Sequence, residues 1–308
     1  MFEKLKSRKP KVTFQNFLCR VPASDYIFQK TPYDEQIQSA AKAIQHADQI
    51  FIGAGAGLSA AAGLTYSGER FQRNFTEFID KYGMTDMYSA GFYPFPREEA
   101  RWGYWSKHVY VNRIALPALP LYRQLKEIVK DKEYFVLTTN TDHQFYKADF
   151  GSEHIFATQG DYGRIQCMRG CHPRTYDDVE MMKQMNAARK DCLVPKCPVC
   201  GGPMAMNLRC DDSFVEDEQW HEAEKRLGSF VEQCKSGKTV LLELGIGFNT
   251  PVIVRFPFEK LARENKNMTL IRLNLNEAVV PESLGSRATG INADMKQSVY
   301  DLLHALDQ

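Results

Sequence analysis

Four cysteines stand in two pairs whose spacing suits a metal ion. Cys197 and Cys200 are separated by two residues and followed by two glycines, and Cys167 and Cys171 are separated by three residues. Both spacings are typical of zinc ribbons, in which four thiolates form a closed tetrahedral site. The sequence therefore predicts a structural Zn²⁺ ion at Cys167, Cys171, Cys197 and Cys200. The alternative is a group of reduced thiols without metal.

A second chemical signal is a glycine-rich turn after a short apolar run. Residues 50–52 are Ile-Phe-Ile, and residues 53–57 are Gly-Ala-Gly-Ala-Gly. Small residues let the backbone approach a phosphate, and a helix that begins there supplies N–H groups and a positive dipole. The common dinucleotide fingerprint fits poorly, because Leu58 stands where its third glycine is expected. A tight turn without a ligand is the alternative interpretation.

The segments around these motifs alternate between helix and strand. Thr31 is expected to cap the first helix. Apolar spacing predicts helices near residues 33–44, 116–130, 220–234 and 294–306, and strands at 50–52, 134–137, 155–157, 239–244 and 268–273. Continuous apolar strands separated by helices favour an α/β fold with a Rossmann-like parallel sheet covered on both faces. Ligands bind such sheets beyond the carboxyl ends of the strands.

Two stretches interrupt this pattern within what we expect to be a single catalytic domain, residues 1–308. An aromatic-rich helical or loop insert is expected at about 66–117, and a small zinc-ribbon module at about 161–212. The remaining residues, about 35–65, 118–160 and 213–308, form the predicted Rossmann-like core. The aromatic insert is interpreted either as a surface for an acceptor protein or as additional core.

Composition limits the classes of partner. The 39 basic and 38 acidic residues give a formal net charge of +1, which argues against nucleic acid and anionic membranes as partners. No apolar run approaches the roughly 18 residues that span a bilayer, and no signal-peptide pattern follows the basic start. We therefore expect a cytoplasmic protein with reduced thiols. Six of the eight cysteines lie between Cys167 and Cys210, which again favours metal.

Five degenerate motifs, in the right order, resemble those of the sirtuin family. They are the turn at 55–59 followed by Gly63-Leu64, the segment 139–142 (Thr-Asn-Thr-Asp), Gln159-Gly160, the turn 245–247 with Pro251, and Asn274. The resemblance covers about residues 35–306. It implies NAD as co-substrate and catalytic roles for Asn140, Asp142 and Gln159. It also implies cofactor contacts from Gly55, Ala56, Gly57, Ser59, Ala60, Arg70, Thr139, Asn140, Asp142, Gln159, Gly245, Ile246, Gly247, Asn274 and Asp294.

The departures from the sirtuin pattern bear on chemistry. Gln159 occupies the position of the sirtuin catalytic histidine, and a glutamine amide cannot act as a general base. Residues 65–68 are Thr-Tyr-Ser-Gly where sirtuins have Pro-Asp-Phe-Arg, so Arg70 and Phe71 are candidates to replace the lost side chains. Loss of a general base typically costs about 10²–10⁴-fold in rate. Cleavage of the nicotinamide bond, which the resemblance assigns to Asn140 and Asp142, is unaffected by this change.

These changes resemble the class M sirtuins of bacteria. That resemblance implies an NAD-dependent protein mono-ADP-ribosyltransferase that acts on a lipoyl-carrier protein, similar to the glycine cleavage H protein, with a macrodomain hydrolase as a further partner. Two alternatives stay open. One is a protein-lysine deacylase in which His143 or His154 replaces the missing base. The other is an NAD-binding sensor or scaffold without turnover.

Overall fold

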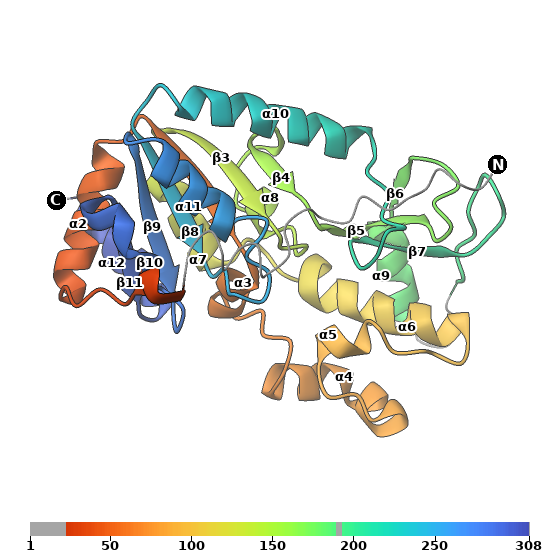
Figure 1. Cartoon of the computed structure of the whole chain (residues 1–308). Helices are drawn as coiled ribbons and strands as arrows, with labels where there is room; N and C mark the ends of the chain where they lie inside the picture. The colour runs from red at the N-terminus through yellow and green to blue at the C-terminus, as the bar shows by residue number, and fades with distance from the viewer. Residues whose placement is uncertain (1–22, 189–192, 308) are drawn as a thin grey trace.

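The computed structural model describes residues 23–188 and 193–307. The basic start of the chain and Cys192 lie outside these residues. A large parallel sheet with its helices forms one part of the molecule, and a smaller antiparallel sheet and a group of helices lie beside it (Figure 1). None of the described helices is long and apolar enough to cross a bilayer.

The large sheet has six parallel strands in the order β11-β9-β8-β2-β3-β4. Its strands are buried almost throughout, and all six residues of β8 are inaccessible, as expected for a sheet covered on both faces. The strands are β2 (Gln49–Ala54), β3 (Glu133–Thr138), β4 (Ile155–Ala157), β8 (Thr239–Leu244), β9 (Met268–Asn274) and β11 (Ala288–Asn292). The predicted Rossmann-like α/β fold is therefore confirmed.

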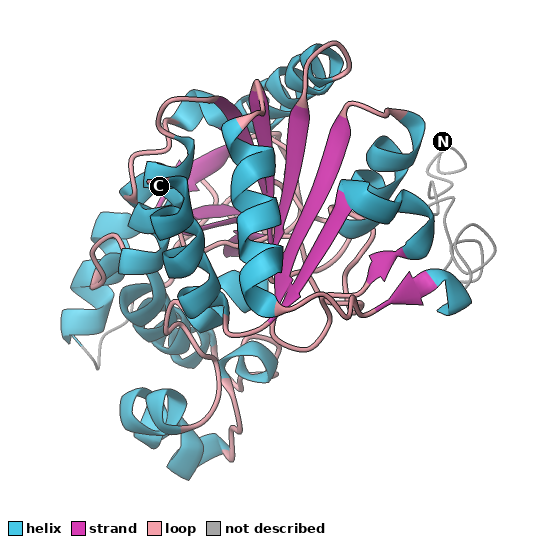
Figure 2. Cartoon of the chain, turned by 90° about the vertical axis from the view of Figure 1, so that its left-hand side faces the viewer, coloured by secondary structure: helices cyan, strands magenta, loops and turns pink. Residues whose placement is uncertain are grey.

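Helices cover both faces of this sheet (Figure 2). One apolar cluster packs α2 (Tyr33–Gln45), α7 (Pro120–Val129) and α12 (Met295–Leu306) against the sheet. Another cluster packs α10 (Glu218–Cys234) and α11 (Arg255–Glu264) against it. Proline at the first position of α7 is favourable because the missing N–H has no partner there. The prediction of Thr31 as a helix cap is wrong: Pro32 is the N-cap of α2, without a side-chain hydrogen bond.

The aromatic-rich stretch folds into helices with an apolar core of their own. Phe71, Phe75, Phe78 and Tyr104 are buried together there, and Trp102 is buried against the neighbouring antiparallel sheet. The helices are α4 (Glu69–Tyr82), α5 (Met87–Ala90), α6 (Glu98–Val109) and the π-helix η2 (Tyr110–Ile114). Most of these aromatic rings are therefore core rather than docking surface.

The cysteine-rich stretch contains a three-stranded antiparallel sheet in the order β6-β5-β7. Its elements are β5 (Gly160–Cys167), β6 (Thr175–Asp177), α9 (Val179–Ala188) and β7 (Met204–Leu208). Near the start of the described chain, β1 (Tyr26–Ile27) pairs with β10 (Val280–Pro281). The short elements are η1 (Ala23–Asp25), α3 (Ala56–Ala61), α8 (Gln144–Lys147), η3 (Ser152–His154) and η4 (Glu282–Arg287).

Candidate active site

Strand register brings the sequence motifs to one edge of the sheet. Ala54, the last residue of β2, lies beside Thr138 of β3 and Leu244 of β8. The glycine turn, the 139–142 segment and the 245–247 turn therefore start side by side. Thr138 is in turn paired with Ala157, two residues before Gln159. This edge holds the carboxyl ends of the strands, where open parallel sheets bind ligands.

Two glycine turns touch each other at this edge. The N–H of Gly55 donates to the carbonyl of Leu244 at 3.0 Å, and that of Gly57 donates to Gly245 at 3.1 Å. A Cβ added to Gly57 would lie 2.8 Å from Gly245, so only glycine fits at position 57. Gly245 has a φ of +64°, which also favours glycine.

The helix after the glycine turn is short. It is α3, six residues long, and the N–H of Gly57 donates to the carbonyl of Gly245. Ala56, Gly57 and Ala60 are exposed along α3. Their small side chains leave room for a ligand to approach the backbone.

A buried polar cluster joins Ser59, Tyr122, Asn140 and Asp142. The Ser59 hydroxyl donates to Oδ2 of Asp142 and lies 2.9 Å from the Tyr122 hydroxyl. Nδ2 of Asn140 donates to the carbonyl of Gly55 at 3.0 Å and lies 3.4 Å from the Tyr122 hydroxyl. The cluster therefore fixes the side chains of α3 and of the loop after β3 relative to each other.

Asp142 is a carboxylate in a desolvated place. Its residue is 5% exposed, and its Oδ1 accepts the N–H of Gln144 at 3.0 Å. Burial raises the pKa of Asp142, while the hydrogen bonds from Ser59 and from the Gln144 N–H act in the opposite direction. A displaced carboxyl pKa within a polar cluster is typical of functional sites.

Gln159 is half-buried between β4 and β5, and the structure holds its backbone rather than its amide. Its carbonyl accepts the N–H of Arg209 at 3.0 Å. The Arg209 guanidinium pairs with Glu216 at 2.6 Å and lies over the ring of Phe214 at 4.2 Å. Within the described residues, no side chain hydrogen-bonds to the Gln159 amide.

Neither histidine proposed as a substitute base lies within the polar cluster. His143, next to Asp142, has a φ of +66° and pairs through Nδ1 with Asp161 at 2.5 Å. Arg113 pairs with the same carboxylate at 2.7 Å. His154 precedes β4, so the strand separates it from Gln159, and its ring packs on Tyr134 at 4.8 Å. His143 lines a polar pocket of about 250 Å³ together with Asp161 and Arg113.

Two tyrosine hydroxyls, absent from the predicted site, lie beside the cluster. Tyr66 and Tyr162 are hydrogen-bonded to each other, and the N–H of Tyr162 donates to the carbonyl of Thr141 at 3.0 Å. Burial raises the pKa of Tyr162 to about 12, so its hydroxyl keeps its proton. Arg70 donates to the carbonyls of Thr65 and Val111 at 2.9 and 3.1 Å and thus holds the Tyr66 loop.

The remaining predicted cofactor residues lie at neighbouring strand ends. Asn274 ends β9 and donates through Nδ2 to the carbonyl of Ile246 at 3.0 Å. The N–H of Thr139 donates to Ala54 at 3.0 Å. Asp294 caps α12 by accepting the N–H of Gln297 at 2.9 Å. The cofactor roles of the individual residues stay predictions.

The comparisons with known proteins agree with this geometry. No protein-family model matches the chain. The fold is that of Sir2 enzymes. A Sir2 homologue–NAD complex matches with a TM-score of 0.58 and 15% identity over 92% of this chain and 99% of that one. A structure described as the basis for the mechanism and regulation of Sir2 enzymes gives 0.56 and 17%, over 89% and 98%.

A curated protein ADP-ribosyltransferase from Staphylococcus aureus is 36% identical over 281 residues, which cover 89% of this chain and 88% of that protein. The chain belongs to the sirtuin-type protein ADP-ribosyltransferases. A probable bifunctional ADP-ribose hydrolase/ADP-ribosyltransferase from Fusarium oxysporum is 34% identical over 256 residues. The match covers 77% of this chain but only 42% of the length of that relative.

Within this sirtuin-type transferase, the four predicted cysteines form a compact group. Their Sγ atoms all lie within 4.8 Å of one another, and the closest pairs are 3.6 and 3.7 Å apart. Tetrahedral zinc with bonds of about 2.3 Å requires sulfur atoms about 3.8 Å apart. Cys167, Cys171, Cys197 and Cys200 therefore fit a structural zinc ion, which would close the end of the β5–β7 sheet.

Several residues of the site escaped prediction. Tyr122 lies on α7, where its ring packs like the other residues of an apolar helix face. The only sequence signal for Tyr122 is its hydroxyl on an otherwise apolar helix face. A buried tyrosine hydroxyl needs a hydrogen-bond partner, so it indicates a polar group nearby. Tyr162 lies on β5, which begins directly after Gln159, and Arg209, which binds the Gln159 carbonyl, directly follows β7. Only the three-dimensional pairing of those strands reveals them.

Proposed function

We propose that this sirtuin-type enzyme transfers ADP-ribose from NAD to a side chain of a lipoyl-carrier protein similar to the glycine cleavage H protein. One observation carries the proposal. The Ser59–Asp142–Asn140 cluster is intact at the carboxyl edge of the sheet, while Gln159, which cannot act as a base, follows β4. The site keeps the groups expected for nicotinamide-bond cleavage and lacks the base that deacylation needs.

An ionised acceptor suits this site. A carboxylate is already deprotonated near neutral pH, so it can attack the ribose carbon without a base. Its oxygen forms the new bond to that carbon as the bond to the nicotinamide nitrogen breaks, and nicotinamide leaves as a neutral molecule. The contribution expected of Asn140 and Asp142 is positioning of NAD and stabilisation of the positive charge that develops on the ribose. Gln159 can orient a ribose hydroxyl through its amide.

Both partners are proposed on the resemblance to class M sirtuins, and one of them has further support. The lipoyl-carrier acceptor follows from the resemblance to class M sirtuins. A macrodomain hydrolase that removes the modification follows from the same resemblance. It is supported by the name of the Fusarium relative, which joins an ADP-ribose hydrolase to an ADP-ribosyltransferase.

Intact-mass spectrometry tests the proposal directly. The enzyme is incubated with NAD and either a lipoyl-carrier protein, with and without lipoate, or a panel of acetyl-lysine peptides. We expect one ADP-ribose to be added to the carrier, with the peptides unchanged. Loss of acetyl groups from the peptides would favour the deacylase instead. Binding of NAD without either product would favour a sensor.

A variant of the polar cluster links that activity to the site. Asn140→Ala removes the hydrogen bond to Gly55. We expect transfer to fall by about 10²-fold or more, because a lost positioning group raises the barrier. Zinc content should remain one ion per chain, which shows that the β5–β7 module is intact. Unchanged transfer by Asn140→Ala would contradict the assignment of the site.

A further inference from the structure

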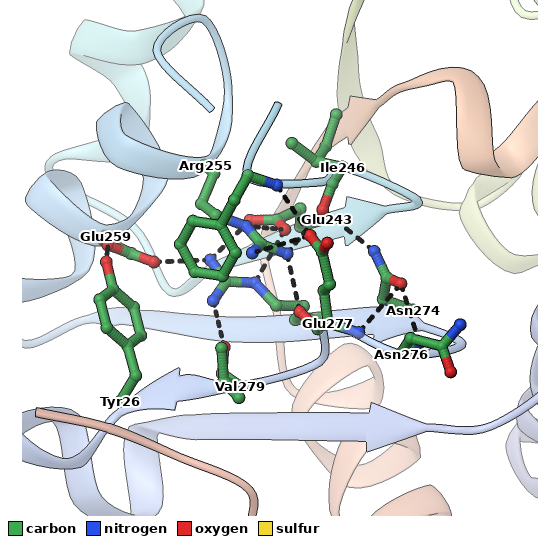
Figure 3. A network of polar contacts seen from close by, with 11 residues as sticks. Tyr26, Glu243, Ile246, Arg255, Glu259, Asn274, Asn276, Glu277 and Val279 are labelled. Atoms are coloured by element: carbon green, nitrogen blue, oxygen red, sulfur yellow. Dashed lines mark hydrogen bonds and ion pairs between the residues drawn. The ribbon is translucent and has the colours of Figure 1, made fainter. Parts of the chain in front are cut away.

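Four charged side chains are completely buried beneath the carboxyl ends of β8 and β9 (Figure 3). Glu243, Arg255, Glu259 and Arg272 are each 0% exposed. Glu243 accepts from Nε of Arg255 at 3.1 Å and from Nε and Nη2 of Arg272 at 2.8 and 2.7 Å. Arg272 also donates to Glu259 at 2.8 Å. Two positive and two negative charges balance, as buried charges must.

Arg255 is the member of this network that reaches the predicted cofactor loops. Its Nη2 donates to the carbonyl of Ile246 at 2.6 Å and to the carbonyl of Glu277 at 2.8 Å. Ile246 belongs to the turn after β8, and Glu277 to the loop after β9. One guanidinium nitrogen therefore ties two loops that lie about thirty residues apart in the sequence.

The side chain of Glu277 completes the connection. Its Oε2 accepts the N–H of Phe248 at 2.7 Å and lies 3.9 Å from Nη1 of Arg255. The ring of Phe248 packs over the Arg255 guanidinium at 4.3 Å. Asn274 adds a third link, because its Nδ2 also donates to Ile246. The conformation of the 245–248 turn thus depends on the 274–277 loop, with Arg255 between them.

The direction of one peptide unit follows from this connection. The described chain has no cis peptide, and in a trans peptide the C=O and the following N–H point in opposite directions. Turning the Ile246 carbonyl toward Arg255 therefore turns the N–H of Gly247 away from the buried network. Replacing a buried ion pair by apolar residues is often neutral or stabilising, so stability alone gives little reason for buried Arg255 and Glu243.

We propose that Arg255 is a positioning residue for NAD, which sets the 245–248 turn and the 274–277 loop in their binding conformation. The inference rests on the proposed function in taking NAD as the ligand of these loops. A planar guanidinium serves this purpose better than an ammonium, because its fixed fork reaches Glu243 and the two carbonyls at once. Arg255→Lys keeps the charge beside Glu243 but loses the fork.

The test compares Arg255→Lys with Tyr26→Phe. Tyr26 donates to Glu259 at 2.7 Å and so belongs to the same network, yet its hydroxyl touches neither loop. Its ring contact with Phe248, at 5.6 Å, survives in the variant. We expect Arg255→Lys to raise the KM for NAD about tenfold while kcat changes less than about threefold. Tyr26→Phe should leave both constants unchanged.

Hydrogen exchange measured without NAD separates this proposal from the proposed function. Arg255→Lys should speed exchange in peptides that cover 245–250 and 274–278, whereas Tyr26→Phe should not. If the variant exchanged faster but the wild-type protein did not bind NAD, NAD would be refuted as the ligand. The structural link between the two loops through Arg255 would still hold. Equal exchange and equal KM in the two variants would overturn the positioning role.

A second variant tests the proposal independently in case Arg255→Lys does not fold. Arg255→Met combined with Glu243→Gln removes one charge of each sign and leaves Arg272 paired with Glu259. We expect the same rise in KM and the same faster exchange in the two loops. A folded double variant with wild-type KM would overturn the proposal, because the network would then be dispensable for binding.

Discussion

Two opposing effects act on the ionised carboxylate of Asp142: hydrogen bonds favour it, and burial disfavours it. Ser59 and the Gln144 N–H bind its carboxylate, yet burial raises its pKa above the ordinary carboxyl value. A raised pKa means that the folded state favours the protonated form. Its contribution to stability is therefore present below the unfolded pKa, about 3.9, and declines as the pH rises above it.

Replacing this carboxylate should separate stability from activity. Asp142→Asn keeps the shape and an acceptor for Gln144, and it removes the buried charge. We expect the variant to become more stable relative to wild type as the pH rises above about 3.9, the unfolded pKa, as measured by denaturant unfolding. ADP-ribosyl transfer should fall by about 10²-fold or more. A variant that loses stability relative to wild type over this rise in pH, or keeps full activity, would contradict this account of Asp142.

Some site residues could be predicted from sequence because they lie next to strand ends. Ser59, Asn140 and Asp142 follow apolar runs that pair in one sheet, and the structure joins them by hydrogen bonds. Tyr122 could not be predicted in the same way, because it comes from a helix whose face packs on the sheet. Arg70 was predicted from its residue type; its guanidinium donates to two backbone carbonyls, and its contact with the cofactor stays a prediction.

At the scale of elements, the start of α9 carries an unusual carboxyl group. Asp178 precedes α9, is 1% exposed, and neither of its Oδ atoms has a hydrogen-bond partner among the described residues. Burial is the largest cause that raises its pKa to about 8, although Arg113 lowers it. The folded state therefore holds a proton there that the unfolded chain releases above about pH 4.

This carboxyl group predicts a slope in stability against pH. Between about pH 4 and pH 8, Asp178 lowers the unfolding free energy by about 1.4 kcal/mol for each unit that the pH rises, because only the folded state keeps the proton. Asp178→Asn removes this contribution. Its unfolding free energy should rise relative to wild type from pH 5 to pH 8 in denaturant titrations. A constant difference between the two proteins across that range would show that Asp178 titrates normally.

Two elements that sequence patterns missed, α11 and β11, were concealed for different physical reasons. The apolar stripe of α11 is interrupted by Arg255 and Glu259, which are buried as ions rather than exposed. Charged residues ordinarily mark the solvent face of a helix, so the pattern conceals the buried side. β11 is short and contains Gly290, whose missing Cβ makes room for the carbonyl of Ala278. The long apolar strands, such as β8, gave no such difficulty.

At the scale of the whole molecule, the zinc module, the aromatic insert and the sheet meet at the site. The apolar cluster of the module contains Cys167, Cys197 and Trp102, and Tyr66 packs against it from the insert. β5 begins directly after Gln159, and its Tyr162 binds Thr141 and Tyr66. We therefore expect order around Gln159 to depend on the module, whereas the large sheet packs in apolar clusters of its own.

Loss of the metal should for this reason strongly reduce activity without unfolding the large sheet. Cys200→Ser removes one thiolate, and structural zinc contributes folding energy to the module that binds it. We expect loss of bound zinc, faster hydrogen exchange across β5–β7, and ADP-ribosyl transfer reduced by about 10²-fold or more through disorder around Gln159. Exchange in β2, β3 and β8 should stay slow, because their packing partners are helices of the core.

The matched control is Cys210→Ser, since Cys210 is exposed and lies outside the group of four sulfur atoms. It should keep zinc, slow exchange in β5–β7 and full transfer. If Cys200→Ser lost zinc and yet transferred ADP-ribose at the wild-type rate, the module would not support Gln159. If β2, β3 and β8 also exchanged quickly in Cys200→Ser, the large sheet would depend on the module for its stability, although the two have separate apolar cores.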